Sequence, residues 1–376
     1  MALKSARAAC RSVWAAVGLL ICMAQASAAV PPARLAVLDR GINIVHWFRF
    51  VSNQNARAMA AYMGEPALVD LKKAGFTYVR LAVGPEEVMS GNHIEADKLT
   101  ALESAIARIE HAGLGVMVEA HPEKIENWDL QNNAMARQEL FGFWHDLAPA
   151  LKPFPAALTF PELVNEPSVK DPAQWDALQR QLLAQVRDAL PKDTIILTGS
   201  DWSSIDGLLK VRPVADANVV YSFHSYEPQL LALLGFWDSA INKKQLAANL
   251  PFPASDPKQC KAAIAAITDP HTHAVAEYWC SLHPDDAMIS RNLARATQWG
   301  HEHRVSVAMT EFGASSELNS PARLAYFSAV RRSAEKLGLP WALWGLDDQM
   351  GLGQSTGSQS AAIRLPPDTM RALGLR

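Results

Sequence analysis

The chain has 376 residues, of which 49% are hydrophobic and 19% are charged, with a formal net charge of −3. This balance, without a basic stripe, argues against a nucleic-acid-binding protein. The apolar fraction suffices for one large core, and the length is normal for an elaborated α/β barrel.

The first residues have the pattern of an export signal. Basic residues precede an apolar stretch from 13 to 23, and a triplet of small residues ends at Ala28. The apolar stretch is about half of the ~20 residues that a membrane-spanning helix needs, and no other segment of the sequence qualifies. We therefore expect a signal peptide over 1–28, cleavage near Ala28, and a secreted or periplasmic protein with no membrane span in the mature chain.

Short apolar runs then alternate with segments of helical period, which is typical of βα units around a parallel sheet. The predicted strands are 42–45, 78–81, 116–120, 157–163, 194–197, 219–223, 305–310 and 341–344. Apolar residues at three- and four-residue spacing predict helices over 67–74, 99–112, 135–147, 175–190, 286–301 and 321–337. Eight strands predict a closed (β/α)8 TIM barrel, and we expect 29–376 to form a single domain.

One long stretch interrupts this alternation between the sixth and seventh predicted strands. We interpret residues 229–304 as an insertion, an elaborated loop over the catalytic rim. It contains Cys260 and Cys280, which remain as a pair once the two cysteines of the signal are removed. In an oxidising compartment such a pair is expected to form a disulfide, the alternative being two free buried thiols.

Chemically competent side chains gather at the predicted strand ends, which converge on one face of a barrel. Glu166 and Glu311 each end an apolar segment. Hydrolysis of a sugar acetal needs one carboxylic acid to protonate the leaving oxygen and one carboxylate to meet the oxocarbenium-like carbon, so this pair points to a glycosidase. Six further candidates lie at strand ends: Arg80, His121, Asn165, His224, Tyr226 and Trp344.

The chain resembles glycoside hydrolase family 5, the cellulase family of the retaining barrel glycosidases. The matching runs, in family order, are RGINIVHWF, AGFTYVRLAV, LGVMVEAHP, FPELVNEP, VVYSFHSYEP, VAMTEFGA and WALWGLDD. The resemblance implies that Glu166 is the general acid/base and Glu311 the nucleophile of a double displacement. Retention of configuration requires the two carboxyl groups to be about 5–5.5 Å apart.

The resemblance also implies the environment of the two carboxyl groups. Arg80 is expected beside the nucleophile, where its charge would lower the pKa of Glu311 and keep it ionised. Tyr226 can donate a hydrogen bond to the same carboxylate. Glu166 faces a negative neighbour in a partly dry cleft, so its pKa should be raised and it should stay protonated near neutrality.

The remaining matches are expected to hold the sugar. Asn165 would bind the 2-hydroxyl, and Trp344 would form an aromatic floor beneath the ring. His121 and His224 would position the substrate and the acid/base. Trp47 and Trp202, which follow the first and fifth strands, are candidates for further sugar platforms, although several tryptophans must be buried for packing alone.

No metal or cofactor is expected. Histidines at 271 and 273, and at 301 and 303, have a spacing that occurs in metal sites, but solvated histidines are the simpler interpretation. Pro161 lies inside the fourth predicted strand, where proline removes a ladder donor, so we expect a bulge or a lost hydrogen bond there.

Together these observations predict a secreted, retaining endo-β-1,4-glucanase whose partner is a polysaccharide. Alternatives within the family are a β-mannanase, a xyloglucanase or an exo-acting β-glucosidase, because these differ chiefly in their loops. A non-catalytic carbohydrate-binding envelope protein is the alternative from another class, and it usually requires a broken catalytic pair. The sequence carries no signal of oligomeric state.

Overall fold

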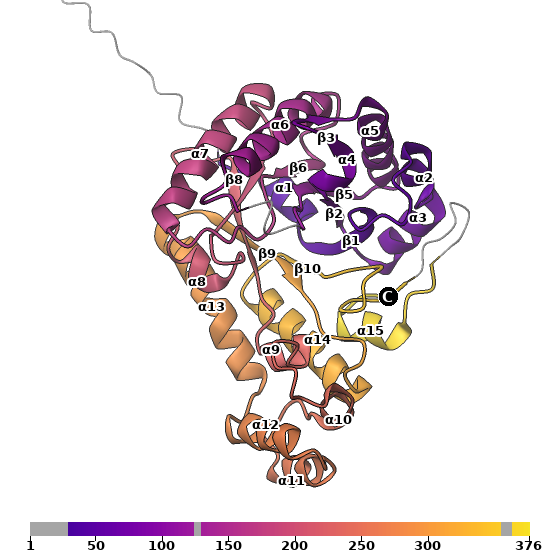
Figure 1. Cartoon of the computed structure of the whole chain (residues 1–376), viewed down its shortest axis with the longest axis vertical. Coiled ribbons are helices and arrows are strands. Elements are labelled where there is room, and N and C mark those ends of the chain that lie inside the picture. Colours follow the sequence, from indigo (N-terminus) through magenta and orange to yellow (C-terminus); the bar gives the residue numbers. More distant parts are fainter. Residues whose placement is uncertain (1–28, 124–128, 355–362) are drawn as a thin grey trace, which may run out of the picture.

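The computed structural model describes residues 29–123, 129–354 and 363–376. The predicted signal peptide, 1–28, therefore lies outside the described residues. Eight parallel strands close into a barrel with the spatial order β1-β10-β9-β8-β7-β6-β5-β2. Each of the eight predicted strands is one of them, and helices surround the ring (Figure 1), which confirms the TIM-barrel fold.

The barrel strands are β1 (Arg40–Phe48), β2 (Tyr78–Val83), β5 (Gly115–Ala120), β6 (Thr159–Glu162), β7 (Ile195–Thr198), β8 (Val219–His224), β9 (Ser306–Phe312) and β10 (Trp341–Leu343). The helices outside the insertion are α1 (Pro32–Val37), α2 (Ala56–Ala61), α3 (Glu65–Ala74), α4 (Pro85–Val88), α5 (Ala96–His111), α6 (Ala134–Leu151), α7 (Pro172–Ala189), α8 (Ile205–Leu208), α14 (Ser320–Lys336) and α15 (Pro367–Ala372). An antiparallel hairpin, β3 (Met89–Ser90) and β4 (His93–Ile94), lies between α4 and α5.

Local sequence signals explain several helix ends. The Asp171 side chain accepts a hydrogen bond from the Ala173 N–H and caps α7. Asn319 caps α14 in the same way, and this helix begins at Ser320, one residue before the predicted start at 321. Gly75 ends α3 with φ 110°, a left-handed conformation that glycine adopts without steric cost.

The barrel interior is closed near the amino ends of its strands by an apolar floor. Seven strands each give one side chain to it: Tyr78, Met117, Phe160, Ile196, Val220, Ala308 and Ala342. Leu38, just after α1, belongs to the same buried cluster. Because the floor fills the amino end, chemistry is confined to the carboxyl end, where TIM-barrel sites lie.

The lost hydrogen bond expected at Pro161 lies on the β7 side of β6. Only one residue pair, Glu162 with Ile196, is in register between these strands. The Leu163 N–H donates to the Ile196 carbonyl at 3.2 Å. Pro161 stands two residues earlier, faces the same neighbour, and has no N–H to donate.

The insertion between β8 and β9 is helical. It contains α9 (Gln229–Leu233), α10 (Lys243–Asn249), α11 (Pro257–Ala265), α12 (Pro270–Ser281) and α13 (Asp286–His303). The first and last of these helices lie against the barrel, whereas α11 and α12 form the end of a lobe that projects away from it (Figure 1). The Asn319 side chain at the start of α14 donates to the carbonyls of Ala247 and Leu250 and anchors the base of the lobe.

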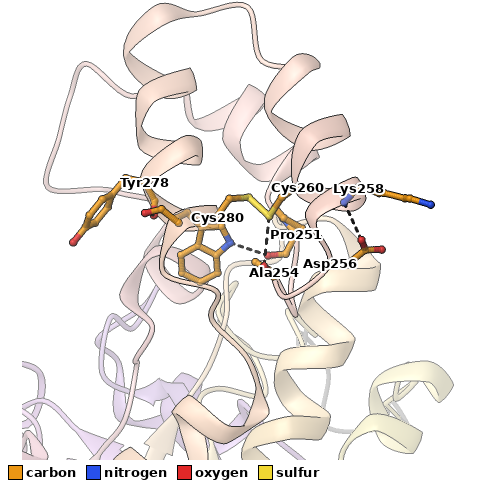
Figure 2. Close-up of a disulfide and its surroundings, with 9 residues drawn as sticks. Pro251, Ala254, Asp256, Lys258, Cys260, Tyr278 and Cys280 are labelled. Atoms are coloured by element: carbon orange, nitrogen blue, oxygen red, sulfur yellow. Dashed lines mark hydrogen bonds between the residues drawn. A yellow bond between two sulfur atoms is a disulfide. The ribbon is translucent and has the colours of Figure 1, made fainter.

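Cys260 of α11 and Cys280 of α12 are joined by a disulfide (Figure 2). The neighbouring Trp279 indole donates to the Pro251 carbonyl. The expectation that the disulfide-bearing segment covers the catalytic rim is wrong. Helices α11 and α12 pack on each other at the far end of the lobe, so the disulfide joins two helices of the lobe and does not join the lobe to the barrel.

Within the described residues, no helix is both long and apolar enough to cross a membrane.

Candidate active site

A polar layer lies directly above the apolar floor. Side chains that point into a barrel recur at every second strand residue, so residues two positions after the floor face the same interior. Several side chains at this level are buried and polar, among them Arg80, Glu119, Glu162 and Ser222, together with Asn43 of β1, which stands in register with Arg80. Buried polar groups require hydrogen-bond partners, and this requirement organises the site.

Arg80 is the centre of the polar layer. Its Nε lies 2.5 Å from Oε2 of Glu162, and its Nη1 lies 2.6 Å from Oε1 of Glu311. Two side-chain amides each accept a further bond at 2.9 Å: Asn43 and Asn165. Arg80 lies within β2 and not at its end as expected, and its long side chain reaches the rim from the buried layer.

Acidic neighbours keep Arg80 charged although it is fully buried. Burial alone would lower its pKa, but Glu119, Glu162 and Glu311 together raise that pKa well above its usual value. Glu162 also accepts a hydrogen bond from the Ser222 hydroxyl at 3.0 Å. The guanidinium is therefore fixed in position before any ligand arrives.

Glu311 points into the barrel because β9 contains an irregularity. Ala308 belongs to the floor and Glu311 contacts Arg80, so two residues an odd number of positions apart face the same interior. Strict alternation forbids this, and the register of β9 shifts against both β8 and β10 at this point. A bulge beside an active site commonly re-aims a side chain in this way. The Tyr226 hydroxyl then donates to Oε2 of Glu311 at 2.7 Å.

Glu166 follows β6 and adopts a left-handed backbone conformation, with φ 41°. A residue other than glycine pays a steric cost there, and such strain persists only where the surroundings fix it. The Asn165 N–H donates to the Ala120 carbonyl at 2.8 Å and holds this segment against β5. The Glu166 carboxylate is thereby turned toward His224, the last residue of β8.

The two carboxyl groups lie close together, and both approach the same ring nitrogen of His224. Its Nδ1 is 2.8 Å from Oε1 of Glu166 and 3.4 Å from Oε2 of Glu311. The three residues place side-chain N or O atoms within 4.8 Å of one another. Glu311 is almost fully buried, whereas 28% of the Glu166 side chain is exposed. One carboxyl group therefore sits deep and fixed, and the other faces the opening.

Burial dominates the electrostatics of this pair. It raises the pKa of Glu166 to about 7, against the opposing charges of Arg80 and Arg49. Burial also raises the pKa of Glu311, although His224 and Arg80 oppose this, so the expectation of a lowered pKa is wrong. Removal of the Glu311 carboxylate from water raises its pKa by more than the contact with Arg80 lowers it. Burial likewise lowers the pKa of His224 to about 4, so its imidazole is neutral.

A second chain of hydrogen bonds orients Asn165. The His121 Nδ1 lies 2.6 Å from Oε1 of Glu119, and its Nε2 lies 3.0 Å from Nδ2 of Asn165. Burial lowers the pKa of His121 well below its usual value, so the ring carries one proton. Since Asn165 Oδ1 accepts from Arg80, its amide nitrogen must donate to His121, and the imidazole proton must lie on Nδ1. This leaves one amide hydrogen of Asn165 for a ligand.

A hollow of about 110 Å³ opens beside Glu166. Its lining includes both His121 and Asn165, and Arg49, Glu123 and Trp202 complete its polar and aromatic walls. A wider hollow of about 850 Å³ continues past Trp202, whose side chain lines both. Trp202 is 46% exposed, as a platform for a sugar ring would be.

The other two tryptophan candidates differ from Trp202. Trp344 is almost buried, with its ring centroid 5.6 Å from that of His121 and the Arg49 guanidinium 5.2 Å away. Trp47 is fully buried, and its indole N–H donates to the Met59 carbonyl at 2.8 Å. The interpretation of Trp47 as a sugar platform is therefore wrong, because α2 packs over it and makes it core.

No role is predicted from the sequence for the residues that support the site from below. Glu162, Asn43 and Ser222 received no role, although each is a polar residue within an otherwise apolar strand. That pattern can be recognised in a sequence, because a polar side chain inside a barrel needs a second polar side chain as its hydrogen-bond partner. The lining residues Arg49 and Glu123, which form an ion pair, left no such signal because they lie in loops.

Glu166, His224 and Glu311 have a spacing that could also hold a metal ion. The Arg80 guanidinium, 2.6 Å from Glu311, already supplies a positive charge at this point. A cation would have to displace it or be repelled by it. The donor set therefore fits proton transfer better than metal binding.

Comparison with known proteins assigns the chain to a family. A sequence profile described as Cellulase (glycosyl hydrolase family 5) matches residues 43–350. Endoglucanase 3 of Fibrobacter succinogenes is 23% identical over 335 residues, covering 82% of this chain and 49% of the relative. Endoglucanase C of Acetivibrio thermocellus is 21% identical over 197 residues, covering 50% of this chain and 57% of the relative. The chain spans about half the length of the curated relatives it matches.

Solved structures share the fold at low identity. A hyperthermophilic endo-β-1,4-glucanase in complex with substrate has a TM-score of 0.71 and 21% identity, over 91% of this chain and 99% of the other. Cel5A of Thermotoga maritima in complex with cellobiose has a TM-score of 0.70 and 20% identity, over 92% and 99% of the two chains. Cellulose synthase subunit Z of Clostridioides difficile has a TM-score of 0.68 and 20% identity, over 89% and 99%.

Proposed function

The chain belongs to the cellulase family, glycosyl hydrolase family 5, and from this premise we propose that it hydrolyses β-1,4-glucan with retention of configuration. Glu311 is the nucleophile and Glu166 the general acid/base. The observation that carries the proposal is the spacing of the two carboxylates, whose oxygens approach within 4.8 Å. Retaining glycosidases have carboxyl groups about 5–5.5 Å apart, whereas inverting ones need about 6.5–9.5 Å to hold a water molecule.

In the first step a carboxylate oxygen of Glu311 forms a bond to the anomeric carbon. The glycosidic C–O bond breaks, and Glu166 gives its proton to the departing oxygen. A pKa of about 7 keeps that proton on Glu166 below neutrality. Within the described residues, hydrogen bonding engages Oε1 of Glu166 and leaves Oε2 for the glycosidic oxygen.

In the second step Glu166, now ionised, removes a proton from a water molecule. The water oxygen bonds to the anomeric carbon, and the bond to Glu311 breaks. Arg80 and Tyr226 receive the restored carboxylate in the geometry they hold throughout. Asn165, oriented through His121, donates to the sugar 2-hydroxyl, a contact that strengthens as positive charge develops at the neighbouring anomeric carbon in the transition state.

The stereochemistry of the product tests this mechanism. Proton NMR during early hydrolysis of a cello-oligosaccharide should show the β-anomer first, with the α-anomer growing only by mutarotation. The α-anomer as first product would contradict the assignment of Glu311 as nucleophile. Failure of any β-glucoside with a good leaving group to react would favour a non-catalytic binding protein.

We further propose endo action on an extended glucan chain. The two hollows run from Glu166 past Trp202, and none of their lining residues belongs to the insertion at 229–304. The matched relatives are named endoglucanases, which supports the same substrate.

A panel of carboxymethyl cellulose, barley β-glucan, glucomannan and xyloglucan tests substrate and mode together. Mixed oligomers from the two glucans, with a rapid fall in viscosity, are expected. A single short product would mean exo action, and faster cleavage of glucomannan would mean a mannanase.

Export completes the proposal. The basic and apolar pattern of 1–28 supports a cleaved signal, and the Cys260–Cys280 disulfide suits an oxidising compartment. Amino-terminal sequencing of protein recovered outside the cytoplasm should begin next to Ala28. Recovery of the full-length chain from the cytoplasm alone would contradict export.

A further inference from the structure

Two histidines and one aspartate form a cluster on the outside of the barrel, where the β3–β4 hairpin meets α6. His93 lies on β4, and His145 and Asp146 are consecutive residues of α6. The His93 Nδ1 is 3.1 Å from Oδ2 of Asp146, and the His145 Nδ1 is 2.9 Å from Oδ1. Side-chain N and O atoms of the three residues lie within 4.8 Å of one another.

The backbone around this cluster fixes its geometry. A Cβ added to Gly142 would meet the Asn92 carbonyl oxygen at 2.0 Å, so only glycine lets the hairpin lie this close to α6. Gly142 is one turn before Asp146 on the same helix face. The Ile94 N–H donates to Oδ2 of Asp146 at 2.9 Å and orients its carboxylate. Support of this kind is typical of the residues behind a metal ligand.

The cluster is both charged and accessible. The side chains of His93 and His145 are 71% and 72% exposed, whereas that of Asp146 is 17% exposed. Partial burial works to raise the pKa of Asp146, but hydrogen bonds from His145, the Ile94 N–H and His93 outweigh it and lower that pKa. The site thus presents one ionised carboxylate below two open imidazoles.

We propose that His93, His145 and Asp146 bind a divalent transition-metal ion of the zinc type. Tetrahedral ligands about 2.0–2.2 Å from zinc lie roughly 3.3–3.6 Å from one another. The contacts of 2.9–3.3 Å in the cluster are close to that spacing. The ion replaces the imidazole protons that now point at Asp146, and solvent water completes its coordination.

The ligand chemistry selects among cations. Imidazole nitrogen with one carboxylate suits zinc, copper or nickel, whereas magnesium and calcium prefer oxygen ligands alone. A bound ion joins the hairpin to α6 by a second set of bonds. It therefore stabilises the folded state without taking part in the proposed hydrolysis, because the cluster shares no residue with the site above the barrel.

Zinc titration of the untagged protein after chelator treatment tests the proposal, since a polyhistidine tag would itself bind zinc. Calorimetry is expected to show one equivalent of Zn²⁺ and no heat with Mg²⁺. His93→Ala and His145→Ala should each weaken zinc binding by at least about tenfold. His301→Ala, which removes an exposed histidine of α13, is the matched control and should bind as the wild type does.

Two further measurements locate the ion. Zinc should raise the Tm of the wild type and of His301→Ala, but not that of His93→Ala. Glucan hydrolysis in chelator should be equal in all three, which shows that the variants fold. Wild-type zinc affinity in both His93→Ala and His145→Ala would overturn the proposal. So would loss of the bound equivalent in Glu311→Gln with retention in His93→Ala, because the ion would then lie among Glu166, His224 and Glu311.

Discussion

Glu166 and Glu311 share one hydrogen-bonding neighbour, since Nδ1 of His224 lies 2.8 Å from the first carboxylate and 3.4 Å from the second. A neutral imidazole has at most one proton on that nitrogen and can donate it to one carboxylate at a time. His224 therefore favours states in which one of the two carboxyl groups is ionised and the other protonated. Double displacement needs this division of charge at its start.

The pH dependence of kcat/KM should reflect that division. Glu166 must be protonated to start the reaction, and its pKa is raised to about 7, so activity should fall as the pH rises through about 7. Glu311 must be ionised, and its pKa is raised by burial, so activity should also fall on the acid side. Initial rates on barley β-glucan from pH 4 to 9 measure both limbs. Full activity at pH 9 would contradict the role of Glu166.

The two carboxyl groups should respond differently to mutation. Glu166→Ala removes the acid and should lower glucan hydrolysis roughly 10²–10⁴-fold, but an aryl glucoside with a good leaving group should still form the glycosyl-enzyme rapidly. Added azide should then rescue turnover and yield a β-glycosyl azide. Glu311→Gln should be inactive on both substrates. Equal losses on both substrates in Glu166→Ala would exclude it as the acid.

Glu166 should lower stability at alkaline pH. Its pKa is raised in the folded protein, so the stability linked to its proton is fully present below its unfolded-state pKa and is lost as the pH rises through about 7. Glu166→Gln has no charge to bury. Its free energy of unfolding should exceed that of the wild type by on the order of 1–3 kcal/mol at pH 8 and should match it at pH 4. Urea unfolding at both pH values tests this, with Glu317→Gln as an exposed control. A gain of the same size at both pH values would rule out the buried charge as its cause.

Glu162 should matter although it does not face the cleft. Its carboxylate lies 2.5 Å from Nε of Arg80 and is itself buried. Glu162→Ala therefore leaves the buried Arg80 charge partly unpaired and should lower the free energy of unfolding by about 3–5 kcal/mol. Glu162→Gln keeps an acceptor and should cost less, about 1–3 kcal/mol. In the milder variant kcat should fall while KM changes little, because Arg80 acts on Glu311 and not on the substrate. A change confined to KM would contradict this positioning role.

Removal of the disulfide should affect stability and spare catalysis. Cys260 and Cys280 are 20 residues apart, and a bridge of that span contributes about 3 kcal/mol in the chain-entropy model. The Cys260→Ser, Cys280→Ser double variant should unfold at lower urea, beginning with the lobe. Its kcat/KM should stay within about twofold of the wild type, because α11 and α12 lie away from the cleft. A large loss of activity would restore the idea that the lobe covers the site.

The sequence predicts the ring of strands well because a buried parallel strand needs a continuous apolar run, and each of the eight runs is present. It also places Glu166 and Glu311 at strand ends. It does not predict that β9 bulges before Glu311, since a register shift depends on β8 and β10 together. The interpretation of Trp47 as a sugar platform is wrong for a similar reason, because the packing of α2 decides whether a tryptophan after this strand is exposed or part of the core.

Of the two pKa expectations, the one for Glu311 is wrong in direction and the one for Glu166 is confirmed in direction. A charge beside a carboxylate was expected to lower the pKa of Glu311, and Arg80 does act in that sense. The sequence does not reveal how completely the layer is removed from water, and desolvation is the larger effect. The raised pKa of Glu166 agrees in direction with the prediction, which rests on a negative neighbour and a partly dry cleft, and burial is its main cause.

The bonds of Arg80 join β2 both to its neighbour β1 and to strands that lie farther round the ring. From β2 its guanidinium reaches Asn43 on β1, Glu162 on β6 and Glu311 on β9. An unfinished ring would leave this cation without Glu162 and Glu311, two of its three acidic neighbours. We therefore expect the active site to assemble only when the fold is complete. Two separately produced halves of the chain should recover glycosidic turnover only to the extent that they reassociate. Turnover would then measure the fraction of molecules in which the barrel is closed.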